Sequence, residues 1–377
     1  SSGNRPFDTA RPPHDGMDDA LIDDDDLSLS RKSVLPGEGF FIPDSVDEAR
    51  ETAEAREAIV GATTIVIADP DADGLACVAL CREAFGSAAL LPAGPHEIAD
   101  ALAHVAEFAD PEARVVVCDL CPDGEADIAP LGDVAATHEV SWFDHHQWND
   151  DLAGLVREAG VDLVVGPSDE VCSADVALEE LGVDAERFAE LAAVTRDHDL
   201  WLREDPRSDD LADYAYWSDP EAYVETVREH GADLPAEVEA SLAERRVEKE
   251  ALIEQAVERG RVVEVNGWTV GVTYGRCSQN EVAEAFRERG ADASVVVKPS
   301  GSASIRGTDE FERCHEVAGQ VNGGGHPKAA GCKPDIYDDM LDYAHHWTTR
   351  GAVTKQVILD AFRALDPEAD GGVETER

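Results

Sequence analysis

Short runs of apolar residues alternate with helical patterns through the first half of the chain. Unbroken runs, as expected for strands covered on both faces, occur at residues 63–68, 114–118, 139–143 and 162–165. Helical patterns follow at residues 75–85, 174–181 and 185–194. Because strands and helices alternate, we predict an α/β domain with an open parallel sheet over residues 41–215.

The pattern changes after this domain. Residues 216–260 are rich in Glu, Arg and Ala and predict a helical linker. Residues 261–366 alternate again and predict a smaller α/β domain. The segments 1–40 and 367–377 are polar and poor in large apolar residues, so we expect tails without a core, the first of them acidic and disordered.

Three predicted strands of the first domain end in acidic or imidazole side chains. These are Asp69, Asp71 and Asp73 after the first strand, Asp119 after the second, and Asp144, His145 and His146 after the third. Turns and helix caps would explain one aspartate at a strand end, but not this number. Ligands of open parallel sheets bind outside the carboxyl ends of the strands, and crowded carboxylates attract a divalent cation.

These residue types are typical of a site for hard divalent cations. Oxygen ligands with one or two imidazoles suit Mn²⁺, Mg²⁺ or Co²⁺ better than soft-site metals. Two such cations can share a carboxylate, activate a water and hold the phosphoryl oxygens of an ester. The candidate ligands are Asp69, Asp71, Asp73, Asp119, His145 and Asp197. We therefore predict two divalent cations, with Mn²⁺ favoured over Mg²⁺ and Co²⁺.

The net charge of the chain indicates a protein that folds in concentrated salt. The formal net charge is -50, from 81 acidic and 31 basic residues. Such self-repulsion destabilises a compact fold in dilute buffer, and 1 M salt screens it over about 3 Å. Hydrophobic residues make up 43% of the chain, which excludes a wholly disordered acidic protein. We expect a cytoplasmic protein of a halophilic archaeon, whose acidity does not exclude nucleic acid as a substrate.

A glycine run in the second domain suggests an anion site. Gly323, Gly324 and Gly325 precede His326. Three glycines let a backbone approach an anion closely and expose its N–H groups. His326 and the more distant Arg306 can then hold a phosphate group. The alternative is an ordinary flexible turn.

In this order, the motifs resemble those of the DHH phosphoesterase superfamily. They are D-P-D-A-D at 69–73, Asp119, the Asp-His-His triplet at 144–146, Asp197, and G-G-G-H at 323–326. The resemblance covers about residues 55–335. It points to members with a C-terminal DHH-associated domain, such as RecJ-type exonucleases, nano-RNases and cyclic-dinucleotide phosphodiesterases. It implies an active site in the cleft between the two domains.

The resemblance also implies a role for each residue. It assigns Asp71 to the first cation, Asp73 to the second, and Asp119 to both as their bridging ligand. His145 and Asp197 would complete the site of the second cation, and Asp69 would lie near the first. Asp199 is a rival to Asp197, because both lie in the motif R-D-H-D-L-W.

For the substrate, His146 would face the phosphate, and Asp144 would orient a histidine. Arg306, the three glycines and His326 would bind the terminal phosphate of the substrate.

The implied function is a Mn²⁺-dependent phosphodiesterase that hydrolyses single-stranded DNA or short oligonucleotides from an end. One alternative is a phosphodiesterase or phosphatase for a small nucleotide, such as cyclic di-AMP or phosphoadenosine phosphate. Another is a replication-complex scaffold with little activity. We expect a nucleic-acid or oligonucleotide substrate and no membrane, since no apolar run approaches the roughly 18 residues needed to span one. A replication or repair partner and a homodimer are left open.

Overall fold

The computed structural model describes residues 44–338 and 340–366, so the predicted tails 1–40 and 367–377 lie outside the described residues. Helix α1 (Asp44–Ile59) begins the described chain. Two compact units follow from the contacts within the chain. The first contains residues 58–121 and 130–234, and the second contains 44–57, 122–129 and 235–366. The units divide between Leu234 and Pro235, within the segment predicted as a linker.

The first unit is built on the predicted parallel sheet. Its strands are β1 (Thr64–Ala68), β2 (Ala89–Pro92), β3 (Arg114–Cys118), β4 (Val140–Asp144) and β5 (Asp162–Val165), in the order β2-β1-β3-β4-β5. β1 is apolar and buried along its whole length, as expected for a strand with both faces covered. The register pairs Ala68 of β1 with Cys118 of β3, and Cys118 with Phe143 of β4. The three strands therefore reach the same edge of the sheet.

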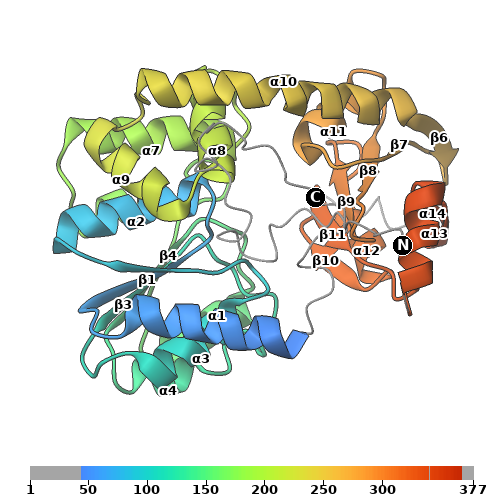
Figure 1. The fold of residues 1–377 in the computed structure, drawn as a ribbon. Coiled ribbons are helices and arrows are strands. Elements are labelled where there is room, and N and C mark those ends of the chain that lie inside the picture. Colours follow the sequence, from blue (N-terminus) through green and yellow to red (C-terminus); the bar gives the residue numbers. More distant parts are fainter. Residues whose placement is uncertain (1–43, 339, 367–377) are drawn as a thin grey trace, which may run out of the picture. The chain divides into compact units, whose positions relative to one another are not determined.

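Helices cover both faces of this sheet. They are α2 (Ala72–Phe85), α3 (Ile98–Phe108), α4 (Leu131–Ala135), α5 (Asp150–Glu158), α6 (Ser173–Leu181), α7 (Glu186–Asp199), α8 (Arg207–Trp217) and α9 (Pro220–His230). In Figure 1, α2, α7, α8 and α9 lie above the strands, whereas α3 and α4 lie below them. Helix α2 is the central one, because it packs against β1 and against α6, α7, α8 and α9.

The second unit contains a six-stranded mixed sheet. Its strands are β6 (Arg261–Val265), β7 (Trp268–Tyr274), β8 (Ala293–Val297), β9 (Ala303–Gly307), β10 (Gly323–Gly325) and β11 (Ala329–Cys332), in the order β10-β11-β9-β8-β7-β6. Only β7 and β8 of these neighbours are parallel. The glycine run thus forms an edge strand, which the sequence did not predict. A Cβ on residue 323 would lie 2.1 Å from the carbonyl oxygen of Gly331, so close strand pairing requires glycine there.

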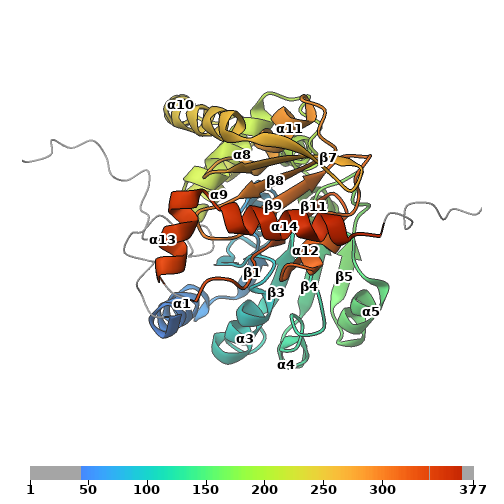
Figure 2. The same cartoon turned by 90° about the vertical axis from the view of Figure 1, so that its right-hand side faces the viewer.

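Helices also cover the second sheet on both sides. They are α10 (Ala236–Arg259), α11 (Gln279–Arg287), α12 (Cys314–Gly319), α13 (Met340–Thr349) and α14 (Ala352–Ala364). Phe286 of α11 packs with Val257 of α10 and Val296 of β8 on one face. Phe362 of α14 packs with Ile305 of β9 on the other, and α14 crosses in front of the sheet in Figure 2.

All eight cysteines lie in the described part of the chain, and all are free thiols. Among the helices described, none combines the length and the apolar composition needed to cross a membrane.

Candidate metal centre

The loop between β1 and α2 places acidic groups at the carboxyl edge of the first sheet. Asp71 caps α2, because its Oδ1 accepts hydrogen bonds from the N–H groups of Asp73 at 3.0 Å and Gly74 at 3.1 Å. The loop is tight, since a Cβ on residue 74 would lie 2.1 Å from the carbonyl oxygen of Asp69. This turn leaves Asp71 exposed, while the side chain of Asp73 is buried.

Asp73 lies against the N-terminus of α6. Its Oδ2 accepts a hydrogen bond from the N–H of Ser173 at 2.7 Å, and its Oδ1 accepts one from the N–H of Ala174 at 2.8 Å. The first N–H groups of a helix lack partners within the helix, and the positive end of the helix dipole favours a carboxylate. Burial still raises the pKa of Asp73 above its usual value, against the opposing effect of His145.

Asp119 follows β3 with a φ of 57°, in the left-handed region that Asp tolerates better than most residues. Its side chain is buried, and Oδ1 accepts a hydrogen bond from the hydroxyl of Ser173 at 2.9 Å. Burial and then the charges of Asp73 and Asp71 raise the pKa of Asp119 well above its usual value. The sequence did not reveal Ser173, because a serine at a helix start gives no sign of a contact with a residue 54 positions earlier.

Asp144 and His146 form a hydrogen-bonded pair after β4. Asp144 is fully buried; its Oδ1 lies 2.8 Å from Nδ1 of His146, and its Oδ2 accepts a hydrogen bond from Nε1 of Trp148 at 2.6 Å. Burial alone would raise the pKa of Asp144, but these two contacts lower it. Burial likewise opposes protonation of His146, yet the hydrogen bond and charge of Asp144 raise the pKa of His146 to about 9. At neutral pH His146 is therefore an imidazolium.

His145 is surrounded by carboxylates. Its Nε2 lies 3.3 Å from Oδ2 of Asp199, 3.8 Å from Oδ1 of Asp119 and 3.9 Å from Oδ2 of Asp73. Within the described part of the chain, neither of its buried ring nitrogens has a hydrogen-bond partner. Burial lowers the pKa of His145, which favours the neutral imidazole that binds metal ions. A buried imidazole without a partner, facing three carboxylates, fits a divalent cation.

The end of α7 presents Asp199, rather than Asp197, to this group. Asp197 instead supports the loop that follows the helix, since its Oδ1 accepts a hydrogen bond from the N–H of Glu204 at 2.9 Å. Its carbonyl oxygen also accepts one from the N–H of Leu202 at 2.8 Å. Burial and then the charges of Asp73 and Asp71 raise the pKa of Asp199 well above its usual value.

The ligand atoms form two overlapping groups. Asp119, His145 and His146 make one, and Asp73, His145 and Asp199 make the other, with the nitrogen and oxygen atoms of each group within 4.8 Å of one another. Because Nδ1 of His146 is hydrogen-bonded to Asp144, the metal ligands of the first group are Asp119 and His145. Oxygen and imidazole donors in this number suit Mn²⁺, Mg²⁺ or Co²⁺. A divalent cation would also offset the repulsion that raises the pKa values of the buried carboxylates. The residues present therefore fit a metal centre, although three of the predicted ligands, Asp69, Asp71 and Asp197, belong to neither group.

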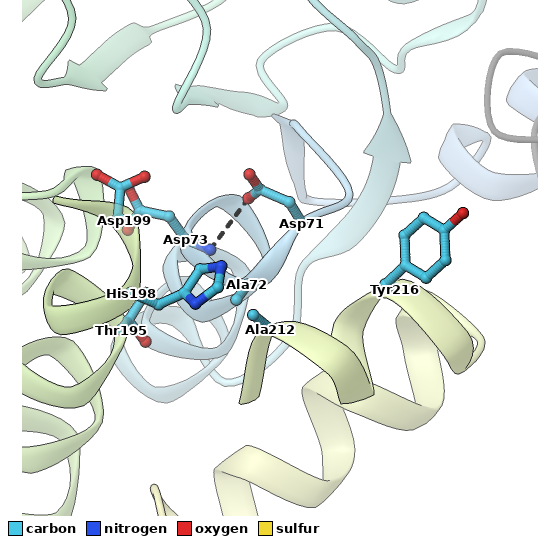
Figure 3. Close-up of a pocket in the computed structure, with 8 residues that line it drawn as sticks. All are labelled: Asp71, Ala72, Asp73, Thr195, His198, Asp199, Ala212 and Tyr216. Atoms are coloured by element: carbon cyan, nitrogen blue, oxygen red, sulfur yellow. Dashed lines mark hydrogen bonds between the residues drawn. The ribbon is translucent and has the colours of Figure 1, made fainter. Parts of the chain in front are cut away.

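A cavity of about 160 Å³ lies beside these residues. It is lined by Asp71, Ala72, Asp73, Thr195, His198, Asp199, Ala212 and Tyr216. Figure 3 shows Asp73 and Asp199 on one side of the cavity and Tyr216 on the other, with Ala72 and Ala212 between them. The sequence predicted Asp71 and Asp73 as metal ligands and Asp199 as the alternative to Asp197. Nothing in it indicated Ala212 or Tyr216, which come from α8.

In the second unit, the structure brings Arg306 beside the glycine hairpin. Arg306 pairs with Ala329 across β9 and β11, and the backbones of Ala329 and His326 are hydrogen-bonded to each other. The guanidinium of Arg306 donates to Oδ1 of Asn280 at 2.8 Å and to Oγ of Ser304 at 2.7 Å. Its hydrogen bonds within the described residues reach only neutral groups.

Comparison with known proteins establishes the fold. No protein-family model and no curated protein matches the sequence. Among solved structures, the DHH domain of a member of the S1P family of ribosomal proteins aligns with a TM-score of 0.55 and 14% identity, over 85% of this chain and 90% of that one. The exonuclease RecJ bound to manganese aligns with a TM-score of 0.52 and 17% identity, over 85% and 95% of the two chains. These similarities confirm the predicted α/β fold class, with the five-stranded parallel sheet first and the six-stranded mixed sheet after it.

Proposed function

We propose that this protein is a divalent-metal-dependent phosphodiesterase of the DHH type, which hydrolyses single-stranded DNA or short oligonucleotides from an end. The observation that carries the proposal is the convergence of ligands from β3, β4, the β1–α2 loop and α7. Asp73, Asp119 and His145 are buried, and Asp199 is the more accessible ligand that joins them. The shared fold and the ordered sequence motifs support it, and the manganese in the RecJ structure supports Mn²⁺ as the ion.

In this proposal the carboxylates and His145 hold two cations. Bound cations would lower the pKa of a water and offset the negative charge on the phosphoryl oxygens. Asp119 would be the ligand shared by the two cations, because its Oδ1 lies 3.8 Å from His145 Nε2, which in turn lies 3.9 Å from Oδ2 of Asp73. Ser173 holds Asp119 in place, and the N-terminus of α6 holds Asp73. Asp199, close to His145, and Asp71, in the same cavity lining, are proposed to complete the ligands.

His146 is proposed to contact the phosphate of the substrate. As an imidazolium with a pKa of about 9, it brings a positive charge to a site that is otherwise rich in carboxylates. Asp144 and Trp148 fix its orientation through buried hydrogen bonds. A positioned cationic donor stabilises the charge that develops on phosphoryl oxygens during hydrolysis.

The proposal is tested by hydrolysis with Mn²⁺ in molar KCl. The substrates are a labelled dinucleotide, longer single strands of DNA and of RNA, and cyclic di-AMP. We expect mononucleotides from the dinucleotide or from one end of a single strand, loss of activity in a chelator, and recovery when Mn²⁺ is restored. Full activity in the chelator would contradict the metal centre. Hydrolysis of cyclic di-AMP alone would favour the small-nucleotide alternative, and no hydrolysis at all would favour a scaffold.

Arg306, the glycine hairpin and His326 are proposed to bind the terminal phosphate of the substrate. Replacing Arg306 with alanine should raise the KM by at least about tenfold, since a hydrogen bond to a charged group contributes about 1.5–3 kcal/mol. The effect should disappear with a substrate that lacks the terminal phosphate. Arg363→Ala is the control and should leave the KM unchanged, because Arg363 is exposed on α14, pairs with Asp360 and lines neither the cavity beside the metal centre nor the one beside Arg306. An unchanged KM for Arg306→Ala would contradict the phosphate-binding role.

A further inference from the structure

The cavity beside the metal centre has two chemically different ends. At one end lie the carboxylates of Asp71, Asp73 and Asp199. At the other lies the ring of Tyr216, which α8 carries into the cavity wall. A phosphoester held at the acidic end would therefore direct one of its substituents toward Tyr216.

Tyr216 differs from the other tyrosines of the chain. All six tyrosines lie in the described part, and Tyr216 is the exposed one among them, with 55% of its surface accessible. Its hydroxyl makes no hydrogen bond to any residue described, and its only ring neighbour there is Trp217, which meets it edge to face at 6.3 Å between ring centroids. One face of an aromatic ring thus remains open in a cavity that reaches the metal ligands.

Small side chains leave room in front of this ring. Ala72 at the start of α2 and Ala212 on α8 lie between the acidic end and Tyr216 in Figure 3. The cavity therefore offers a flat aromatic face and open space between that face and the acidic end. This combination matches a planar group linked to a phosphate.

We propose that Tyr216 forms a base-binding subsite, in which a nucleobase next to the scissile phosphate stacks on the tyrosine ring. The inference rests on the proposed phosphodiesterase function and names the side chain that would recognise the nucleobase beside the reacting phosphate. Stacking on an aromatic side chain tolerates any base, because every base has a π face. The subsite therefore selects nucleotides without selecting a sequence.

The test compares substrates with and without the base. A dinucleotide is assayed beside two analogues, each lacking the base on one side of the scissile phosphate, in the full chain with Mn²⁺ and molar KCl. For Tyr216→Ala, kcat/KM on the intact dinucleotide should fall by about 5- to 150-fold, the range expected for losing one base stack. With one of the two abasic analogues, the variant and the wild type should be equally active. Tyr216→Phe keeps the ring and should retain the wild-type preference.

Leu155→Ala is the matched control, since Leu155 is another exposed apolar residue of the first unit and does not line the cavity. Its kcat/KM should remain that of the wild type on every substrate. An equal loss for Tyr216→Ala on all three substrates, or no loss on any, would overturn the subsite. Failure of the underlying function has a different signature, because the wild type would then hydrolyse none of the substrates.

Discussion

Replacing Asp119 with asparagine should lower kcat by at least about 10³-fold, because a bridging ligand supports both cations and their charge contributes several kcal/mol to the transition state. The asparagine has the same shape, so it can fill the same space beside Ser173. It lacks the negative charge that a cation requires. Steady-state hydrolysis measures the loss, and titration with Mn²⁺, followed by thermal unfolding, measures the accompanying loss of metal binding.

A matched control separates the site from the general acidity of the chain. Asp133→Asn removes one charge from an exposed position on α4, outside the ligand groups and the cavity lining. It should leave both hydrolysis and the Mn²⁺-induced rise in Tm unchanged. Activity of Asp119→Asn near that of the wild type would exclude Asp119 as a metal ligand.

The same variant has a second readout, which needs no activity. In a chelator, a carboxylate whose pKa is raised by folding holds its proton more tightly in the folded state than in the unfolded state. The free energy of unfolding should therefore fall as the pH rises from about 4, the usual value for Asp, through the raised pKa. Asp119→Asn removes one such group, so this fall should be smaller than in the wild type.

The sequence predicted the parts of the fold whose signals are local. The apolar runs of β1, β3 and β4 are buried along almost their whole length, as expected for strands covered on both faces. Such a run can be recognised from neighbouring residues alone. The acidic residues after these strands were predicted to meet because parallel strands end at one edge. The structure does place Asp73, Asp119 and His145 together there.

The remaining parts depend on contacts between distant segments. The strand β10 is made of glycines, which have little strand propensity. It forms by pairing with β11, which lies so close that a side chain at residue 323 would not fit. Ser173 reaches Asp119 only because α6 packs beside α2 at the end of the sheet. Tyr216 enters the cavity from α8, a helix whose sequence carries no sign of the metal ligands around it.

The sequence pattern also could not decide which of two aspartates in one helical turn, Asp197 or Asp199, faces the metal centre. Both lie in the last turn of α7, and the sequence pattern favoured Asp197. In the structure, Asp199 lies 3.3 Å from Nε2 of His145, whereas Asp197 accepts a hydrogen bond from the backbone of Glu204. Two positions along a helix differ by about 200° in direction, so the side chains of the two aspartates serve different neighbours.

Asp199→Asn should therefore lower kcat by about 10²-fold or more and weaken Mn²⁺ binding, because an amide replaces a charged ligand. Asp197→Asn should keep most of the activity, since the side-chain oxygen of asparagine can still accept the hydrogen bond from Glu204. The Asp197→Asn substitution should lower the free energy of unfolding by about 1 kcal/mol. The amide nitrogen of the asparagine would take the buried position of Oδ2, which has no hydrogen-bond partner among the described residues, and would be left without an acceptor. Kinetics and Mn²⁺ titration of the two variants, two residues apart on one helix, measure the difference. If Asp197→Asn were the inactive variant and Asp199→Asn the active one, Asp197 would be the ligand and the end of α7 would have to turn when the metal binds.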